Sequence, residues 1–131
     1  MEGKLIENIR LENGLILEIF DHSRHVAGDR WLVSLEARIE VEVKPDYFTD
    51  HYTLNMSFEN IRAVVGEKTT YSYKKERHFI GEKEKDELLN GLKVRFLETN
   101  LGYLSSPEFP LKLILRRYHE AYSRTFLRKE R

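Results

Sequence analysis

The 131-residue sequence contains no cysteine. A disulfide framework, a thiol nucleophile, a thiolate zinc site and an iron–sulfur cluster are therefore excluded. Glycine and proline are also scarce, and the seven glycines are isolated from one another, so no phosphate-cradling loop is present. With 40% hydrophobic and 34% charged residues, the chain is long and apolar enough to fold as a globular protein without such crosslinks.

Long apolar segments are missing as well. No stretch approaches the roughly 20 residues that a membrane-spanning helix needs. The first ten residues alternate charged and apolar side chains and contain no apolar segment typical of a secretory signal. We therefore expect a soluble, cytoplasmic protein without a membrane partner.

Neither sign of charge is in excess, because 22 basic residues balance 22 acidic ones. A neutral molecule has a weak long-range field, which argues against nucleic acid as the partner. The C-terminal helix is nevertheless basic, and its face would bind a phosphate backbone through Arg116, Arg117, Arg124 and Arg128. The alternative is a solvated helix face whose cations complement the helix dipole.

The segment from Trp31 to Val43 has the clearest periodicity. Every odd position is apolar, and every even position after Leu32 is polar. This period of two is typical of a strand with one buried and one solvated face. We expect the odd residues Val33, Leu35, Ile39 and Val41 in the core, and the even residues Glu36, Arg38, Glu40 and Glu42 in solvent.

Two earlier apolar segments flank Glu12-Asn13-Gly14. The spacing predicts a hairpin with a three-residue turn, Gly14 in the left-handed region and Ile9 opposite Leu17. A two-residue turn would shift the register by one and invert the faces, so the bulged turn is favoured. A second turn within Arg24–Arg30 would return the chain and place Ile19 opposite Leu35.

The segment between Tyr47 and Gly66 permits two interpretations, which are compatible with each other. A strand is indicated by the alternation of Tyr52, Leu54, Met56 and Phe58. A short helix is indicated by the spacing of Phe58, Ile61 and Val65, with Ser57 as its cap and Gly66 as its end. Thr69–Ile80, rich in Thr, Tyr and Phe, is expected to form another strand.

Helical spacing of apolar residues begins after Glu82 and again after Pro107. Strands followed by helices predict an α+β fold: a mainly antiparallel sheet of four or five strands with two C-terminal helices packed on one face. A single domain over residues 1–131 accounts for the length. In the last helix we expect Tyr118, Tyr122 and Phe126 to dock on the sheet.

The densest polar cluster lies between Asp21 and Trp31. Asp21, His22 and Ser23 are the residue types of a hydrolytic triad, but consecutive strand residues alternate faces and cannot align as one. The same strand and turn geometry separates His22 from His25, so we expect no metal there. A ligand site at this hairpin tip is one alternative, with the candidate residues Asp21, His22, Ser23, Arg24, His25, Asp29 and Arg30.

No catalytic or cofactor motif is visible, so we expect no cofactor and favour binding over catalysis. The leading hypothesis is a non-catalytic binding or protein-interaction module, whose protein partner would contact an apolar patch of Ile16, Phe20 and Leu32. Two alternatives belong to other classes. One is a nucleic-acid-binding protein that uses the basic C-terminal helix, and the other is a small-ligand binder or enzyme with its site at the hairpin tip.

Overall fold

The computed structural model describes the backbone of residues 3–48 and 57–129, and the side chains among these as far as Ser123. The chain divides into two compact units. Unit 1 consists of Met1–Ile39 with Tyr71–Ser106, and unit 2 of Glu40–Thr70 with Pro107–Arg131. The interpretation of the chain as a single domain stays a prediction.

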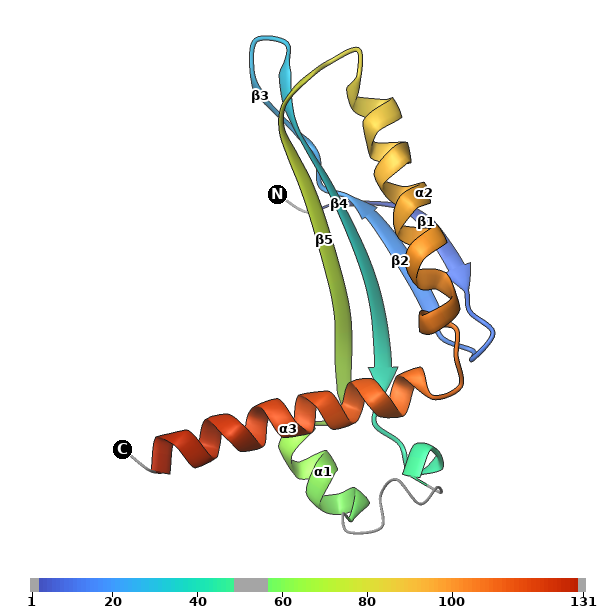
Figure 1. Cartoon of the computed structure of the whole chain (residues 1–131), viewed down its shortest axis with the longest axis vertical. Coiled ribbons are helices and arrows are strands. Elements are labelled where there is room, and N and C mark those ends of the chain that lie inside the picture. Colours follow the sequence, from blue (N-terminus) through green and yellow to red (C-terminus); the bar gives the residue numbers. More distant parts are fainter. Residues whose placement is uncertain (1–2, 49–56, 130–131) are drawn as a thin grey trace. The chain divides into compact units, whose positions relative to one another are not determined.

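Five strands form one sheet: β1 (Lys4–Arg10), β2 (Ile16–Asp21), β3 (Arg24–Ala27), β4 (Arg30–Glu42) and β5 (Lys68–Gly81) (Figure 1). β2 and β3 pair antiparallel with successive stretches of β4. β5 also pairs with β4, and bonds join Ser34, Glu36 and Val43 to Glu76, Ser72 and Glu67, so it occupies the other edge of β4. Together with the helices, this sheet confirms the α+β class.

The first hairpin has the predicted bulged turn. Gly14 has a φ of +88°, Leu11 N donates to Leu15 O at 2.8 Å, and Ile9 pairs with Leu17. The Asn13 amide then donates to the carbonyl oxygens of Leu104 (2.8 Å) and Ser106 (2.9 Å). These bonds attach the turn to the end of the helix α2 (Lys85–Leu104).

The second hairpin differs from the prediction by two residues. Ile19 pairs with Ala37 and not with Leu35. The reason is a tight turn at Gly28 and Asp29, which lets the preceding residues continue as β3 instead of forming a long loop. Because the shift is even, the same side chains still face the core.

The core of unit 1 lies between the odd-numbered face of the sheet and α2. Val33, Leu35 and Ile39 are fully buried, and so is Val41 in unit 2, which confirms the four burial predictions. From α2, Leu92 and Phe96 are buried, and the Phe96 ring lies 4.7 Å from that of Tyr73.

The even-numbered face of β4 is solvated only in part. Glu40 and Glu42 are exposed as expected, and Arg38 is about half exposed. Glu36, however, is only 7% exposed, so its predicted exposure was wrong. The strands on both sides of β4 supply side chains that cover it.

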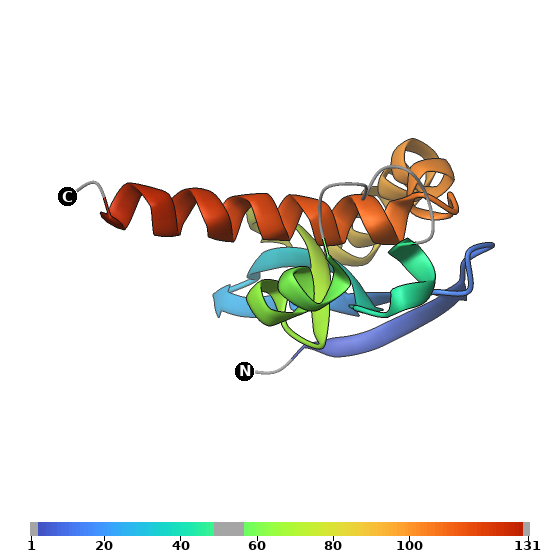
Figure 2. The ribbon, with the colours of Figure 1, turned by 90° about the horizontal axis from the view of Figure 1, so that it is seen from below.

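Unit 2 contains a short 3-10 helix (Pro45–Phe48), α1 (Phe58–Val65) and α3 (Phe109–Lys129). α1 packs against α3 (Figure 2), and Ile61 and Ile114 are fully buried. Ser57 Oγ accepts from Asn60 N at 3.1 Å, and Gly66 ends the helix with a φ of +102°, which confirms the predicted cap and end. The strand predicted over Tyr52, Leu54 and Met56 lies outside the described residues.

The apolar anchors of α3 are concentrated near its start. Phe109, Leu113 and Ile114 are buried, whereas Tyr122 is 60% exposed and stacks on Tyr118. The expected docking of Tyr122 on the sheet was therefore wrong. The side chain of Phe126 is outside the described part of α3.

Replacing Leu35 by Ala should lower the free energy of unfolding by about 2–5 kcal/mol, because the substitution leaves a cavity in a fully buried strand position. Chemical denaturation followed by circular dichroism measures this. Ile16→Ala, at a position 43% exposed on β2, is the matched control and should cost much less. Equal losses for the two variants would contradict the assignment of the two faces.

Candidate functional site

The sheet of unit 1 has an open face on the side opposite α2. We define it by the even-numbered residues of β4 from Leu32 to Arg38 and of β5 from Ser72 to His78. Ser34 Oγ donates to Glu76 Oε2 (3.1 Å), and Ser72 Oγ donates to Glu36 Oε2 (2.9 Å), so these residues meet on one face. α2 contacts the other face through Tyr73.

Glu36 is the centre of a polar cluster on the open face. Its Oε1 lies 2.6 Å from His22 Nε2 and 3.1 Å from Arg38 Nη2, while Ser72 donates to Oε2. Burial raises the pKa of Glu36, but the hydrogen bonds from His22 and Ser72 and the charge of Arg38 outweigh it and hold the pKa below its usual value.

Neighbouring groups restrict the His22 ring from two sides. The Phe20 ring stacks against it with a centroid distance of 6.0 Å, and the Arg38 guanidinium lies 4.7 Å from the centre of the Phe20 ring. Gly3 lies so close that an added Cβ would be 2.2 Å from His22 Cε1. A side chain at residue 3, just before β1, would therefore require the imidazole to move.

A hollow of about 570 Å³, the open-face hollow, lies where β2 ends and β3 begins. Asp21, His22, Ser23 and Arg24 line it from this bend, and Lys4 lines it from β1. Leu32 and Ser34 belong to β4, and Lys74, Glu76 and His78 to β5. Three strands and one bend thus contribute side chains to one site.

The bend exists because side chains replace part of the β ladder. Asp21 Oδ1 accepts from Ser23 N (2.8 Å), and Ser23 Oγ accepts from Ser34 N (3.0 Å). His22 N still donates to Ser34 O at 2.9 Å. The chain therefore stays attached to β4 while residues 22 and 23 leave the regular strand.

The basic and acidic side chains that line the hollow differ in whether they have partners within the protein. Lys4, Arg24 and Lys74 form no ion pair or hydrogen bond through their side chains within the described residues. Asp21 and Glu76, by contrast, each accept a hydrogen bond, from Ser23 N and Ser34 Oγ. The charges free to meet a ligand are thus mainly positive.

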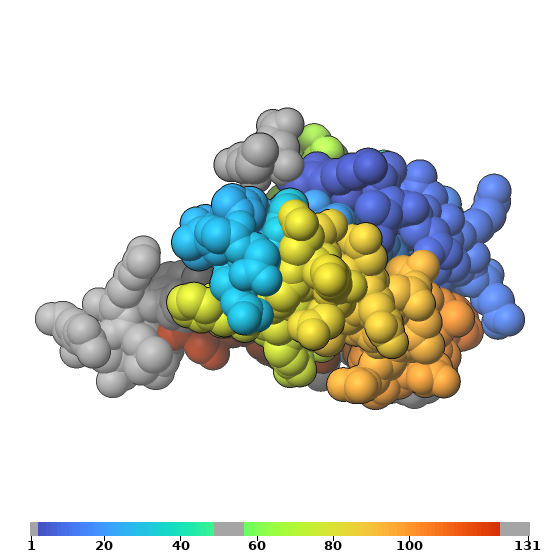
Figure 3. All heavy atoms as spheres, turned by 90° about the horizontal axis from the view of Figure 1, so that it is seen from above, coloured from blue at the N-terminus to red at the C-terminus, as the bar shows by residue number. Residues whose placement is uncertain are grey.

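The structure brings together four of the seven candidate residues from the hairpin tip, namely Asp21 to Arg24. The other three, His25 on β3, Asp29 in the β3–β4 turn and Arg30 at the start of β4, do not line the hollow. His25 bonds to Gly28 O and contacts the Trp31 ring edge-on, and Arg30 lies 3.6 Å from Asp29. Asp29 O also accepts from Glu82 N, so this turn lies against the loop after β5 (Figure 3).

Sequence reasoning missed the contributions of β1, β4 and β5 to the hollow. Lys74, Glu76 and His78 share one parity in the predicted strand Thr69–Ile80, and that alternation was the available signal. Placing them beside Ser34 required the β4–β5 pairing, which no local pattern specifies. Leu32, expected in an apolar patch with Ile16 and Phe20, lines the hollow and is 9% exposed.

The structure describes the side chains of two of the four basic residues predicted to bind nucleic acid, Arg116 and Arg117. Arg117 lies 3.0 Å from Glu120 and donates to Thr70 O at 3.1 Å, while Arg116 is exposed. The side chains of Arg124 and Arg128 lie outside the described residues. Nucleic-acid binding by these four residues stays a prediction.

No family model, curated protein or solved structure matches this chain. Among the residues with described positions, no group of three or more His, Asp or Glu could hold a metal ion. None of the helices described in these two units has the length and hydropathy needed to cross a membrane.

Replacing Glu36 by Gln should lower the free energy of unfolding at pH 7 by about 1–3 kcal/mol, because charged hydrogen bonds to His22 and Arg38 are lost. The pKa of Glu36 is depressed below its ordinary value of 4.5. Its contribution is therefore complete above that value and is lost as the pH falls through the folded pKa. Denaturation of both proteins between pH 7 and pH 3 should show the difference shrinking with acid.

Glu42→Gln, at an exposed position of the same strand, is the control and should change stability little. A wild-type advantage that stays constant down to pH 3 would contradict the role assigned to the Glu36 carboxylate.

Proposed function

We propose that this protein is a non-catalytic binding module, and that its open-face hollow binds a ligand carrying a phosphate group. The observation that carries the proposal is the convergence of Lys4, Arg24 and Lys74 on a hollow of about 570 Å³. This volume is within the range of small-molecule sites. Cations from three segments, unpaired within the described residues, favour an anionic group at their centre.

The two acids in the hollow do not cancel this preference. Three cationic side chains against two carboxylates leave an excess of one positive charge while His22 and His78 are neutral. Both carboxylates already accept hydrogen bonds from protein groups. The Arg24 guanidinium offers two parallel donors to phosphate oxygens, and the lysines offer point charges.

The roles of His22 and Ser23 favour binding over catalysis. His22 directs Nε2 to Glu36, and Ser23 Oγ accepts from the main chain of Ser34. A nucleophile needs a base within hydrogen-bond reach, and these two residues are committed to other partners. Their hydrogen bonds shape the site instead.

Titration with inorganic phosphate and then pyrophosphate, followed by ¹H–¹⁵N NMR spectra, tests the proposal. We expect amide shifts in residues 21–24, 34 and 74–78, and tighter binding of pyrophosphate because it carries more charge. Lys74→Ala and Arg24→Ala should each weaken binding about tenfold, since hydrogen bonds to charged groups contribute about 1.5–3 kcal/mol and tenfold corresponds to 1.4 kcal/mol.

Lys75→Ala is the matched control, because Lys75 follows Lys74 but has its side chain on the opposite face of β5. It should retain wild-type affinity. Equal weakening by Lys74→Ala and Lys75→Ala, or shifts spread over all basic residues, would mean that the anion binds non-specifically and would overturn the proposal.

A further inference from the structure

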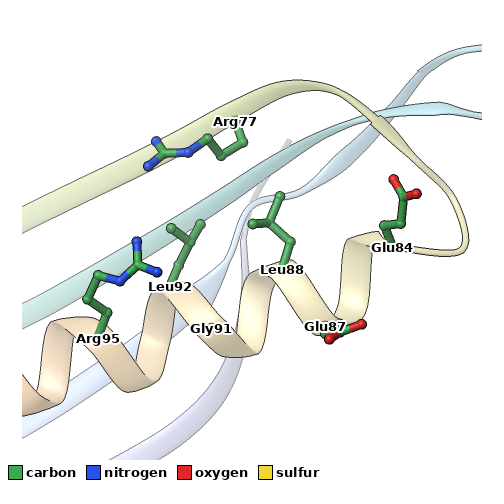
Figure 4. A pocket seen from close by; sticks show the side chains of 7 residues that line it. All are labelled: Arg77, Glu84, Glu87, Leu88, Gly91, Leu92 and Arg95. Atoms are coloured by element: carbon green, nitrogen blue, oxygen red, sulfur yellow. The ribbon is translucent and has the colours of Figure 1, made fainter.

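A groove lies between β5 and α2 on the face of the sheet opposite the open face. It consists of two hollows of about 330 and 370 Å³, which share Arg77, Leu92 and Arg95. Figure 4 shows the first of them, with Arg77 on the strand and Arg95 on the helix bordering the same space. We call this the β5–α2 groove.

The floor of the groove is apolar, and there is unoccupied space above Gly91. Leu88 and Leu92 project from α2 toward the strands (Figure 4), and Phe96 packs on Tyr73 from β5. Gly91 lies between the two leucines, and a Cβ added there would meet no atom within 4 Å. Because residue 91 has no side chain, the space above the helix stays open.

Charge is unevenly distributed along the groove. Lys75, Arg77 and Arg95 line it, and none of them forms an ion pair with another described residue. Glu84 and Glu87 line the end near the start of α2. The groove is therefore basic over most of its length and acidic at one end.

The edge of β5 beside this groove presents unpaired main-chain groups. In the described part of the sheet, β5 pairs with β4 alone. Glu67 O accepts from Val43 N across that pair, whereas the carbonyl oxygens of Thr70 and Glu76 accept from arginine side chains. Main-chain groups alternate in direction along an antiparallel strand. The N–H and C=O groups of the even-numbered residues between Thr70 and Glu76 therefore point away from β4.

We propose that the β5–α2 groove binds an extended acidic segment of another protein, which pairs with β5 as an added strand. The free N–H and C=O groups at Ser72 and Lys74 would bond its backbone, as in other cases of strand addition. Side chains alternate along a strand, so every second residue of the segment faces the groove. Carboxylates at those positions would meet Lys75, Arg77 and Arg95.

The two acids mark one end of the site. For a segment antiparallel to β5, the N-terminal end would lie near Glu84 and Glu87, and its carboxylates would follow beside the three cations. Phe79, with a φ of +57°, ends the regular edge on that side. This site lies on the other face from the phosphate site, so neither proposal depends on the other.

The test uses a fluorescein-labelled decapeptide in which Glu and Thr alternate, titrated with the full-length protein and followed by fluorescence anisotropy. We expect binding that weakens as salt rises, and at least tenfold weaker binding when Gln replaces Glu in the peptide. Arg77→Ala and Arg95→Ala should each weaken binding about tenfold. Arg10→Ala removes an exposed cation of β1 that lines neither hollow of the groove, so it is the matched control and should leave the affinity unchanged.

A second pair of variants tests the groove without removing charge. Gly91→Leu fills the open space and should abolish binding, while it favours the helix more than glycine does. Gly91→Ala adds only one methyl group and should keep most of the affinity. ¹H–¹⁵N spectra of each variant verify that it is folded, and loss of binding by Gly91→Ala equal to that by Gly91→Leu would overturn the proposed location.

Strand addition is distinguished from simple charge attraction by a peptide with N-methyl groups on alternate amides. This peptide keeps its carboxylates but cannot pair with β5, so its binding should be at least tenfold weaker. Unchanged binding would overturn strand addition. Concentration-dependent dimers whose Ser72 and Lys74 amides are protected from exchange would also overturn the proposal, because a second copy would then occupy the edge.

Discussion

β4 is paired along both of its edges, and the rest of unit 1 depends on this double pairing. One edge holds β2 and β3, and the other holds β5. Where neighbours flank it on both sides, the even-numbered side chains Ser34 and Glu36 are buried, because side chains from these neighbours lie beside them. Its odd-numbered side chains form the centre of the core under α2. Both faces of the strand are therefore specified by residues that are distant in sequence.

This arrangement buries the Glu36 carboxylate, which by itself is destabilising. The side chains that offset this destabilisation form the polar cluster of the open face. A carboxylate removed from water is destabilising unless charged or hydrogen-bonding partners surround it. His22, Arg38 and Ser72 provide them, and they come from both neighbours and from β4 itself. His22 reaches Glu36 from the bend that interrupts β2 and β3. The same interruption opens the hollow, so the compensation of one buried charge and the proposed ligand site share a structural cause.

The two faces of β5 offer different chemistry because side chains alternate along a strand. Lys74 lines the open-face hollow, whereas its neighbour Lys75 lines the β5–α2 groove. The hollow is lined mainly by polar side chains and suits a compact anion. The groove is elongated, has an apolar floor and borders an unpaired strand edge, so an extended chain suits it better. One strand would thus serve two binding surfaces without any residue contributing its side chain to both.

The sequence by itself determined the features that depend on local spacing and backbone conformation: the buried face of β4, the bulged turn at Gly14, and the ends of α1 at Ser57 and Gly66. Side-chain periodicity and the backbone conformation of glycine depend on residues that are close together in the sequence. They can therefore be predicted without a structure. Only the tertiary structure decided the pairing of Ile19 with Ala37, the burial of Glu36 and the meeting of Asp21–Arg24 with residues of β5. These features depend on strand register and on contacts across the sheet, and side chains far apart in the sequence establish them together.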